Sequence, residues 1–477
     1  MYILDQWFSV KNLKKIYDFE KRKWIQIEDK FKNHYYLIFL LNNNITEEAK
    51  KRNEFYKLRK KYIIDSTDYQ KISEKIQNIN NEIDKLKELR ENKILKILEK
   101  VSENINTSIF EFWLKKELET KTKKYIYKTE KHESFYCIKK LQYNINKIYK
   151  VIQSNRFQIV SWLILSINNK LPKKIIKLDL KSFYESISFD QIINQIEKDW
   201  FLSFQSINFL KIINEEYKSL GNVNWLPRWL WISAYLSEFY MRNFDENIKN
   251  MNGIYYYWRY VDDIIIVAEN STKDYVNEIN KVIKNNNLTI QINSSKNKFI
   301  MFDIDNSLKV SSLDFDWKKI PNLNSFDYLW YNIKFEKNWD SNIKVNLSNK
   351  KNEKIKQKID LAFHFYNFNT NKWEKTSQDL IIKRIRYLTS NVNLIWKKKN
   401  IKTWIYYSNS LIDENNVSIN ELDNYLKSKI GMLTNNRLKE KLNTFSFEEW
   451  FKNKNLYFLK RKNINNFKKL TKIWKYV

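Results

Sequence analysis

Apolar positions along the chain recur in two patterns, one typical of helices and the other of buried strands. From about Tyr69 to Leu98 apolar residues recur in steps of three and four, which predicts one long amphipathic helix or a helical hairpin with its apolar stripe on a core. Residues 1–60 predict a mixture of helix and short strands, including the apolar run at 35–41. No membrane span is predicted, because no apolar run approaches 18 residues.

The middle of the chain, residues 171–335, alternates apolar strand-like runs with helical stretches, and residues from about 345 onward look mostly helical and remain basic. No linker rich in Pro, Gly or Ser marks a boundary. We expect three regions: a mostly helical N-terminal region at 1–110, a strand-rich region at 111–340, and a basic, mostly helical C-terminal region at 341–477.

Composition adds a probable kind of partner and excludes several kinds of site. The net charge of +31 favours a polyanionic partner, most often nucleic acid, although an AT-rich genome also enriches Lys. Three Gly cannot build a dinucleotide-binding fingerprint or a P-loop, and one Cys with three His cannot form a structural zinc site or a disulfide framework. The N-terminus lacks a signal-peptide pattern, so we expect a cytoplasmic protein.

The ratio of tryptophan to glycine is unusual, with 17 Trp against three Gly. AT-rich coding depresses Gly, but it should equally depress Trp, whose standard codon is rich in G. One hypothesis explains both anomalies. UGA specifies Gly in at least one bacterial genetic code, so UGA codons that mean Gly and are translated as Trp would deplete Gly and enrich Trp.

Two acidic sites stand at the ends of apolar runs. Asp262 and Asp263 separate two apolar, β-branched and aromatic runs within 254–269, which predicts a hairpin of buried strands, and Asp179 ends another apolar run. Adjacent carboxylates repel each other and resist burial, and a bound divalent cation removes this penalty. A hydrophilic turn is the alternative interpretation of the Asp pair. Together, the three acids suit an oxygen-liganded Mg²⁺ site.

Five motifs in order resemble the sequence boxes of reverse transcriptases. They cover roughly residues 155–335 and are YVDD at 260–263, DLKSFY at 179–184, NWLPRWLWISAYLSEFYM at 224–241, NSSK at 293–296 and YLWY at 328–331. The residues within and around the boxes, with SFYESI, LPR and TWIYYSNSLI at 403–412, resemble those of bacterial defence-associated enzymes. These are the abortive-infection and "unknown group" types, and the resemblance is nearest to the type 3 defence systems.

This resemblance implies an α+β right-hand polymerase fold, with fingers and palm at 111–340 and a thumb-like region at 341–477. It implies a DNA polymerase, RNA-directed or else untemplated, that transfers nucleotides from dNTPs to a 3′-hydroxyl or another priming hydroxyl. Two Mg²⁺ ions would support this reaction, and Mn²⁺ could replace them. Asp179, Asp262, Asp263 and the Leu180 carbonyl would bind the metal.

Other residues receive roles from the same resemblance. Lys296 would neutralise or protonate the leaving pyrophosphate, and Tyr184, beside Phe183, would exclude a 2′-hydroxyl. Arg228 would touch nucleotide or template, and Arg156 matches a fingers arginine.

Tryptophans stand where the family has glycine or another small residue. These positions are Trp225, Trp229, Trp231, Trp258, Trp330 and Trp404, with Trp450 as a further candidate. If they are misread glycines, several should lie unusually exposed or crowd the active site, while Trp474 should pack normally. If they are genuine, the protein is a degenerate polymerase.

Three functions stay open at this point. An active polymerase in antiphage defence leads, since a dead fold has no reason to keep buried acids. The alternatives are an inactive polymerase fold that only binds a structural RNA, and a retron or intron-type reverse transcriptase. Expected partners are an RNA template or non-coding RNA, DNA product and dNTPs, with a partner protein or a second copy left open and no membrane.

Overall fold

The structure, a computed structural model of the chain, describes residues 4–23, 27–64, 66–119, 123–151, 154–169, 171–223, 225–295, 298–305, 309–335, 343–396, 399–413, 416–460 and 470–474. The chain forms two compact units, each assembled from separate stretches of sequence. Unit 1 comprises Met1–Gln153, Leu180–Asn247 and Tyr275–Ile292, and unit 2 comprises Ser154–Asp179, Ile248–Asp274 and Asn293–Val477. Described helices include none long and apolar enough to cross a membrane.

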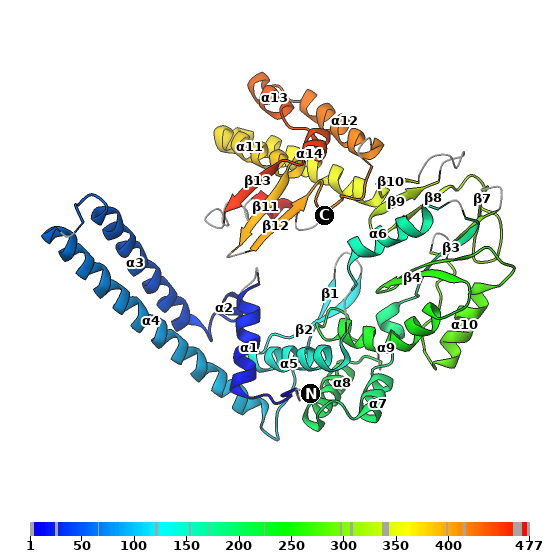
Figure 1. Cartoon of the computed structure of the whole chain (residues 1–477), viewed down its shortest axis with the longest axis horizontal. Coiled ribbons are helices and arrows are strands. Elements are labelled where there is room, and N and C mark those ends of the chain that lie inside the picture. Colours follow the sequence, from blue (N-terminus) through cyan, green and yellow to red (C-terminus); the bar gives the residue numbers. More distant parts are fainter. Residues whose placement is uncertain are drawn as a thin grey trace. The chain divides into compact units, whose positions relative to one another are not determined.

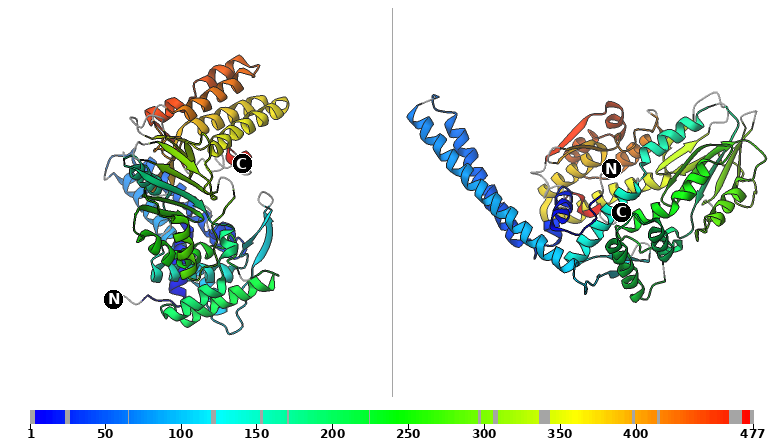
Figure 2. Two further views of the ribbon diagram at one scale, coloured as in Figure 1. Left: turned by 90° about the vertical axis from the view of Figure 1, so that its right-hand side faces the viewer. Right: turned by 60° about the horizontal axis from the view of Figure 1, so that its bottom comes forward.

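Unit 1 begins with four helices, α1 (Val10–Lys21), α2 (Ile27–Lys30), α3 (Tyr36–Arg59) and α4 (Thr67–Ile105). The predicted amphipathic stretch is one continuous helix, α4, which starts at Ser66, whose side chain accepts a hydrogen bond from the Tyr69 N–H. α3 and α4 run side by side as a long hairpin (Figures 1 and 2). A short strand at 35–41 is wrong, because from Tyr36 onward the run is the first part of helix α3, which runs along α4. Ile38 is buried, whereas Tyr36, Leu37, Phe39 and Leu40 stay exposed.

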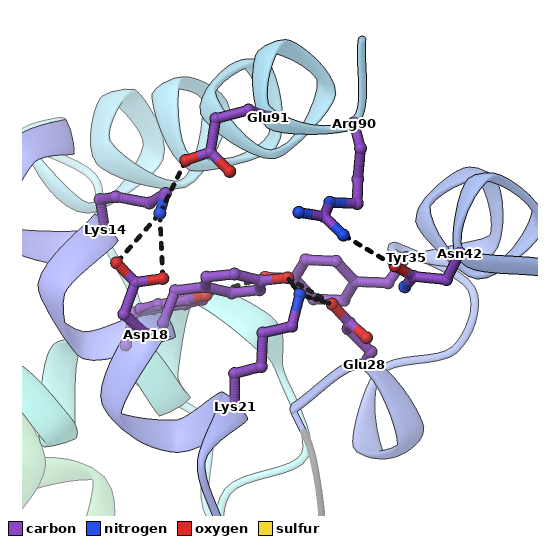
Figure 3. Close-up of polar contacts among 10 residues, drawn as sticks. Lys14, Asp18, Lys21, Glu28, Tyr35, Asn42, Arg90 and Glu91 are labelled. Carbon is purple, nitrogen blue, oxygen red and sulfur yellow. Dashed lines mark hydrogen bonds and ion pairs between the residues drawn. The ribbon is translucent and has the colours of Figure 1, made fainter. Parts of the chain in front are cut away.

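Polar contacts tie the first helices together (Figure 3). The Lys14 ammonium pairs with Asp18 on its own helix at 2.9 Å and with Glu91 of α4 at 2.8 Å. From α4, Arg90 donates to the Asn42 side chain of α3 at 3.2 Å. These contacts join helices that are far apart in sequence at the base of the α3–α4 hairpin.

The rest of unit 1 is a two-stranded hairpin and further helices. Its elements are β1 (Lys115–Glu119), β2 (Lys124–Lys128), α5 (His132–Tyr149), the 3₁₀ helix η1 (Phe183–Ser186), α7 (Phe189–Asp199), α8 (Phe204–Ser219), most of α9 (Ser233–Lys249) and α10 (Tyr275–Asn285). Lys139 and Lys140 are buried on α5, where Lys140 donates to the Asp5 carbonyl at 2.7 Å.

Unit 2 contains a five-stranded antiparallel sheet in the order β4-β5-β3-β6-β7. Its strands are β3 (Lys173–Asp179), β4 (Ile254–Tyr260), β5 (Asp263–Glu269), β6 (Ile300–Ile304) and β7 (Val310–Leu313). The predicted hairpin around the Asp pair is therefore confirmed, as β4 and β5. Helix α6 (Arg156–Ile167) packs on β4 and places Ile159 and Leu163 in the core with Ile265 of β5.

The remainder of unit 2 combines two small sheets with helices (Figure 1). Strands β8 (Ser325–Tyr328), β9 (Tyr331–Lys334) and β10 (Lys344–Leu347) form one sheet, followed by the long helix α11 (Asn349–Thr389). After it come β11 (Asn391–Trp396), β12 (Lys399–Trp404), α12 (Val417–Gly431), α13 (Asn436–Asn443), α14 (Phe447–Asn453), β13 (Leu456–Lys460) and η3 (Lys472–Trp474).

The predicted helical C-terminal region thus includes a three-stranded sheet, β12-β11-β13, that sequence pattern did not show. Its strand β13 pairs in parallel with β11 across some 60 residues of chain, a long-range contact that leaves no local signature. The predicted α+β class is confirmed by this mixture of helices and antiparallel sheets. The boundaries at 110 and 340 stay a prediction.

Candidate active site

Three aspartates meet at one end of the five-stranded sheet. In the antiparallel register Asp179, the last residue of β3, lies opposite Asp263, the first residue of β5. Asp262 directly precedes Asp263 in the turn from β4. Residues directly opposite in an antiparallel pair project to the same face, so two carboxylates are held side by side, and like charges in this position repel.

A strained two-residue turn presents Asp262. Tyr260 pairs with Asp263, so Val261 and Asp262 alone connect β4 to β5. Val261 has a φ of 59°, which is an outlier for a β-branched residue. The buried Arg259 side chain donates a hydrogen bond to the Val261 carbonyl at 3.0 Å and so stabilises the turn. Strain of this kind persists where surrounding structure enforces it, commonly at functional sites.

Two side chains from the segment before β6 bind the Asp179 carboxylate. Asn293 donates to Asp179 Oδ2 at 3.0 Å, and Lys298 Nζ lies 3.2 Å from Oδ1. The Asn293 N–H also donates to the Asp179 carbonyl at 2.8 Å. Asp179 is only 5% exposed, so these contacts replace the water that a buried carboxylate loses. Sequence reasoning quoted Asn293 as part of a box but missed Lys298.

Burial and mutual repulsion act on the other two carboxylates. Burial, with the charges of Asp263 and Asp179, raises the pKa of Asp262 to about 6. Burial also raises the pKa of Asp263, although the charges of Lys177 and Lys298 oppose this. The pKa of Lys177 is itself lowered by burial, which its acidic neighbours counter in part. The site therefore carries negative charge that nearby lysines only partly offset, as a cation-binding site requires.

The donor set suits Mg²⁺ bound together with a substrate. In the part of the chain that the structure describes, no three acidic, His or Cys side chains gather closely enough to hold a metal ion by themselves. Mg²⁺ in phosphoryl-transfer enzymes is usually bound by one or two carboxylates plus substrate phosphates, not by an all-protein cage. Asp179, which Asn293 and Lys298 hold in place, and Asp262, whose charge is poorly offset, lie at one end of the sheet and fit that mode.

The nucleotide-contacting residues predicted from resemblance are mostly in unit 1. Leu180 is buried and bridges to Ile292. Phe183 is buried in η1, with the half-buried Tyr184 ring edge-on to it at 5.3 Å. Arg228 makes a two-pronged ion pair with Glu185, in which Nη2 lies 3.0 Å from Oε2. Lys296 lies outside the described residues.

Arg156 is in unit 2, at the start of α6. Its guanidinium lies over the Tyr260 ring, 4.7 Å from the centroid, and its side chain is exposed. It also lines a cavity with lysines of α11. Arg156 thus adjoins the residue that begins the YVDD box.

The tryptophans at family glycine positions divide into two groups. Trp229, Trp330 and Trp404 have φ values of 64°, 78° and 87°. The Trp229 side chain is 64% exposed, as expected of a tryptophan at a position that has no packing space for an indole. Trp225, Trp231 and Trp258 have no positive φ and are half-buried. Of the six, only Trp229 is unusually exposed as predicted, because Trp330 and Trp404 are half-buried like these three.

Two tryptophans show how a well-placed indole packs. Trp231 has Phe135 edge-on at 5.2 Å and the ammonium groups of Lys30 and Lys139 over its ring at 4.2 and 4.3 Å. Trp474 is 8% exposed and its indole N–H donates to the Lys358 carbonyl at 3.0 Å. Normal packing of Trp474 was predicted and is confirmed.

Comparison with known proteins agrees with the site. The family described as reverse transcriptase (RNA-dependent DNA polymerase) matches residues 57–356. Among solved structures, telomerase from Candida albicans, in complex with a TWJ fragment of telomeric RNA, is similar with 11% sequence identity and a TM-score of 0.29. The similarity covers 64% of this chain and 52% of that chain, so this chain spans about half the telomerase's length. No curated protein matches the chain.

The family match spans both the strand ends that carry the aspartates and the β8–β9 hairpin. Helices combined with antiparallel sheets are what the predicted right-hand polymerase fold requires. A match over more than half of the sequence, centred on these elements, shows that the chain belongs to the reverse transcriptase family.

Proposed function

We propose that the protein is a DNA polymerase that extends a 3′-hydroxyl or another priming hydroxyl with dNTPs, directed by RNA or without a template. The observation that carries this proposal is the pair of opposed strand ends that holds Asp179 and Asp263, with Asp262 in the adjoining turn. Placing the half-buried Asp262 and Asp263, whose pKa values are raised, beside the buried Asp179 destabilises a fold unless a cation binds them. The arrangement therefore favours an active enzyme over a fold that only binds RNA.

Asp179 and Asp262 would hold the two Mg²⁺ ions, with Asp263 assisting and the Leu180 carbonyl as a backbone ligand. When bound, Mg²⁺ would activate the attacking hydroxyl and neutralise the leaving pyrophosphate. Asn293 fixes the rotation of the Asp179 carboxylate by donating to one oxygen, which leaves its other lone pairs for ligands.

Lys298 contacts the second oxygen of Asp179 while remaining half exposed. Its ammonium could therefore also contact an incoming phosphate. This role is close to the one that resemblance gives to Lys296, two residues earlier, and the two lysines can share it.

The nucleotide would be selected by residues that follow Asp179 in sequence. Tyr184, braced by the buried Phe183, would exclude a 2′-hydroxyl by its bulk. Arg228 would orient the nucleotide or template, and its ion pair with Glu185 sets its direction. Arg156 would contribute positive charge from the start of α6.

The resemblance of the motif sequences to those of defence-associated enzymes supports a role in antiphage defence. The net charge of +31 supports RNA and DNA as partners. A retron or intron-type enzyme would share the same chemistry. Adjacent genes distinguish these systems, because a retron requires a neighbouring structural-RNA gene.

Polymerase activity is tested by dNTP incorporation with the purified full-length chain carrying Gly at the suspect tryptophan positions, primed and unprimed, with Mg²⁺ or with EDTA. We expect incorporation with Mg²⁺, its loss in EDTA, and its loss in Asp262→Ala. Glu269→Gln is the matched control, because Glu269 is the acid at the opposite end of β5, paired with Lys173. Incorporation that survives in Asp262→Ala would refute the metal assignment. A chain that binds RNA but incorporates no dNTP under any condition would favour the RNA-binding alternative.

A further inference from the structure

A cavity of about 530 Å³ lies within unit 2, where α6, the β8–β9 turn, α11 and the end of β12 meet. Four cationic side chains line it: Arg156 from the first turn of α6, and Lys351, Lys354 and Lys358 along one side of α11. The lining contains no Asp or Glu. Like charges collected without a counter-charge are unfavourable, so this arrangement indicates a place for an anionic ligand.

The surroundings of the lysines show that their charges are not neutralised within the described residues. The Lys351 ammonium donates to the Asn409 side chain, a neutral acceptor. Burial, with the charges of Arg156 and Lys358, lowers the pKa of Lys351 to about 8, and burial with the charge of Lys354 lowers that of Lys358. A bound polyanion would relieve both the repulsion and the lost hydration.

Other features of the lining suit a nucleotide in particular. Tyr331 and Tyr407 supply aromatic rings for a base, and Thr403, Ser408 and Asn409 supply polar groups. The first turns of α6 and α11 border the cavity, and helix N-termini favour phosphate. A volume of this size holds one compact ligand, since small-molecule pockets span about 300–1,000 Å³.

We propose that this cavity binds the polyphosphate of a single free nucleotide, with Arg156, Lys354 and Lys358 as the phosphate contacts. The proposal goes beyond the polymerase chemistry, because none of the three aspartates lines the cavity. Arg156 is shared with the proposed polymerase site, so the test rests on Lys354 and Lys358, which have no role there. A nucleotide bound here would join α11 to α6 and to the β8–β9 turn. It would thereby stabilise unit 2 in one arrangement.

The test is isothermal titration of the full chain with dATP in EDTA, which removes the metal that a polymerase site needs. We expect dATP to bind, and Lys354→Gln and Lys358→Gln each to weaken binding roughly tenfold to hundredfold, as loss of a charge-assisted contact does. The matched control is Lys356→Gln, since Lys356 lies between them on α11 but pairs with Glu353 at 2.9 Å. Lys354→Arg keeps the charge and should restore binding.

Two results would overturn the proposal. One is dATP affinity that is equal in the Lys354, Lys356 and Lys358 variants, or absent in the unmodified chain. The other is binding of a single-stranded DNA oligonucleotide that weakens in the Lys354 and Lys358 variants while dATP binding does not. That result would make the cavity a binding site for a nucleic-acid strand. Thermal unfolding of each variant separates lost binding from lost folding.

A second inference comes from backbone conformation and stands independently of the cavity. Five described tryptophans have positive φ: Trp200, Trp229, Trp317, Trp330 and Trp404. Trp200 ends helix α7 in the left-handed conformation where glycine is usual, and Leu329–Trp330 is a two-residue hairpin turn with both φ values positive. Trp317 closes a tight turn, donating its N–H to the Asp314 carbonyl at 3.1 Å.

Each site is thus one where backbone geometry favours glycine for its own local reason. Five of the thirteen described non-glycine residues with positive φ are tryptophan, although 17 of the 477 residues are. The residues enriched in this conformation are ordinarily Asn, Asp and His. Two of the five, Trp200 and Trp317, were not suspected from motif departures, so they extend the pattern beyond the family boxes.

We infer that these five positions are glycine in the functional protein and that their codons are UGA. The coding DNA, together with peptide mass spectrometry of the chain from its natural host, tests this. We expect UGA codons and glycine masses at all five, and UGG with tryptophan at Trp474. UGG codons and tryptophan masses at Trp200 and Trp317 would overturn the inference. Glycine at 330 and 404 would remove two indoles that line the cavity and would enlarge it. It would also free the Lys354 and Lys358 ammonium groups from these rings, over which they lie at 5.2 and 4.9 Å.

Discussion

Trp200 offers the sharpest test of whether backbone conformation marks glycine positions. It follows α7 with φ 56° and ψ 10°, and its side chain is 89% exposed. Trp200→Gly and Trp200→Ala remove the same few side-chain contacts, so their difference reports on the backbone alone. The left-handed conformation costs an L-residue about 1–2 kcal/mol, and glycine is free of this penalty.

Glycine has an opposing disadvantage of about 0.4–1 kcal/mol relative to alanine, because it gives the unfolded chain more conformational freedom. At Trp200 the two effects leave Gly more stable than Ala by about 1 kcal/mol. Trp7 is the matched control, since it lies in the same unit, is 70% exposed and does not have a positive φ. There Ala should be more stable than Gly by about 0.4–1 kcal/mol.

The assay is urea unfolding of the four variants followed by circular dichroism, with the Gly–Ala difference in midpoint as the readout. Because both sites belong to unit 1, the same unfolding transition reports on each. The expected outcome is opposite signs at Trp200 and Trp7. The same sign at both positions would refute the assignment of a left-handed backbone that favours glycine at residue 200.

Four further results are expected. Asp262→Asn should stabilise the metal-free chain by up to about 3 kcal/mol, because a carboxyl whose pKa is raised from 3.8 to about 6 disfavours folding when charged. The gain should be full above pH 6 and vanish below pH 3.8, and urea midpoints measured above and below these values check it. Tyr184→Ala should raise rNTP incorporation while dNTP use persists, and an unchanged dNTP-to-rNTP ratio would make the ring a packing residue only. Lys298→Gln should lower kcat/KM about tenfold without abolishing activity, because Asp179 keeps its contact with Asn293, and wild-type kinetics would exclude the proposed role. Trp474→Gly should destabilise the chain by about 3–5 kcal/mol in urea unfolding, and a neutral result would contradict the packing of its buried indole.

Local pattern in the sequence determined the elements whose signals are strongest. Apolar residues spaced three and four positions apart predicted α4. The β-branched runs on both sides of Asp262 and Asp263 predicted the β4–β5 hairpin. The order of five motifs indicated the family that the comparison then showed. These signals are readable because residues near one another in the chain decide helix periodicity, strand propensity and turn chemistry.

Only the tertiary structure decided features that depend on distant residues. Lys298 reaches Asp179 across 119 positions, and the cavity brings Arg156 to Lys351, neither of which any local pattern encodes. The run at 35–41 became part of α3, which pairs with α4 although most side chains of the run stay exposed, and the C-terminal sheet formed because β13 returns to β11.

The tryptophans show most clearly what the sequence alone cannot determine. Motif departures marked Trp229, Trp330 and Trp404 in the sequence, but the same reasoning marked Trp225, Trp231 and Trp258 without support. It also passed over Trp200 and Trp317. A residue name does not reveal the sign of φ, which is set where neighbouring elements force the chain to turn. Trp404 shows that the two criteria are separate: its φ is positive, yet its indole N–H donates to the Leu388 carbonyl and its ring stacks on Tyr387 at 5.3 Å. Backbone conformation marks the positions that favour glycine, whether or not the indole there finds contacts.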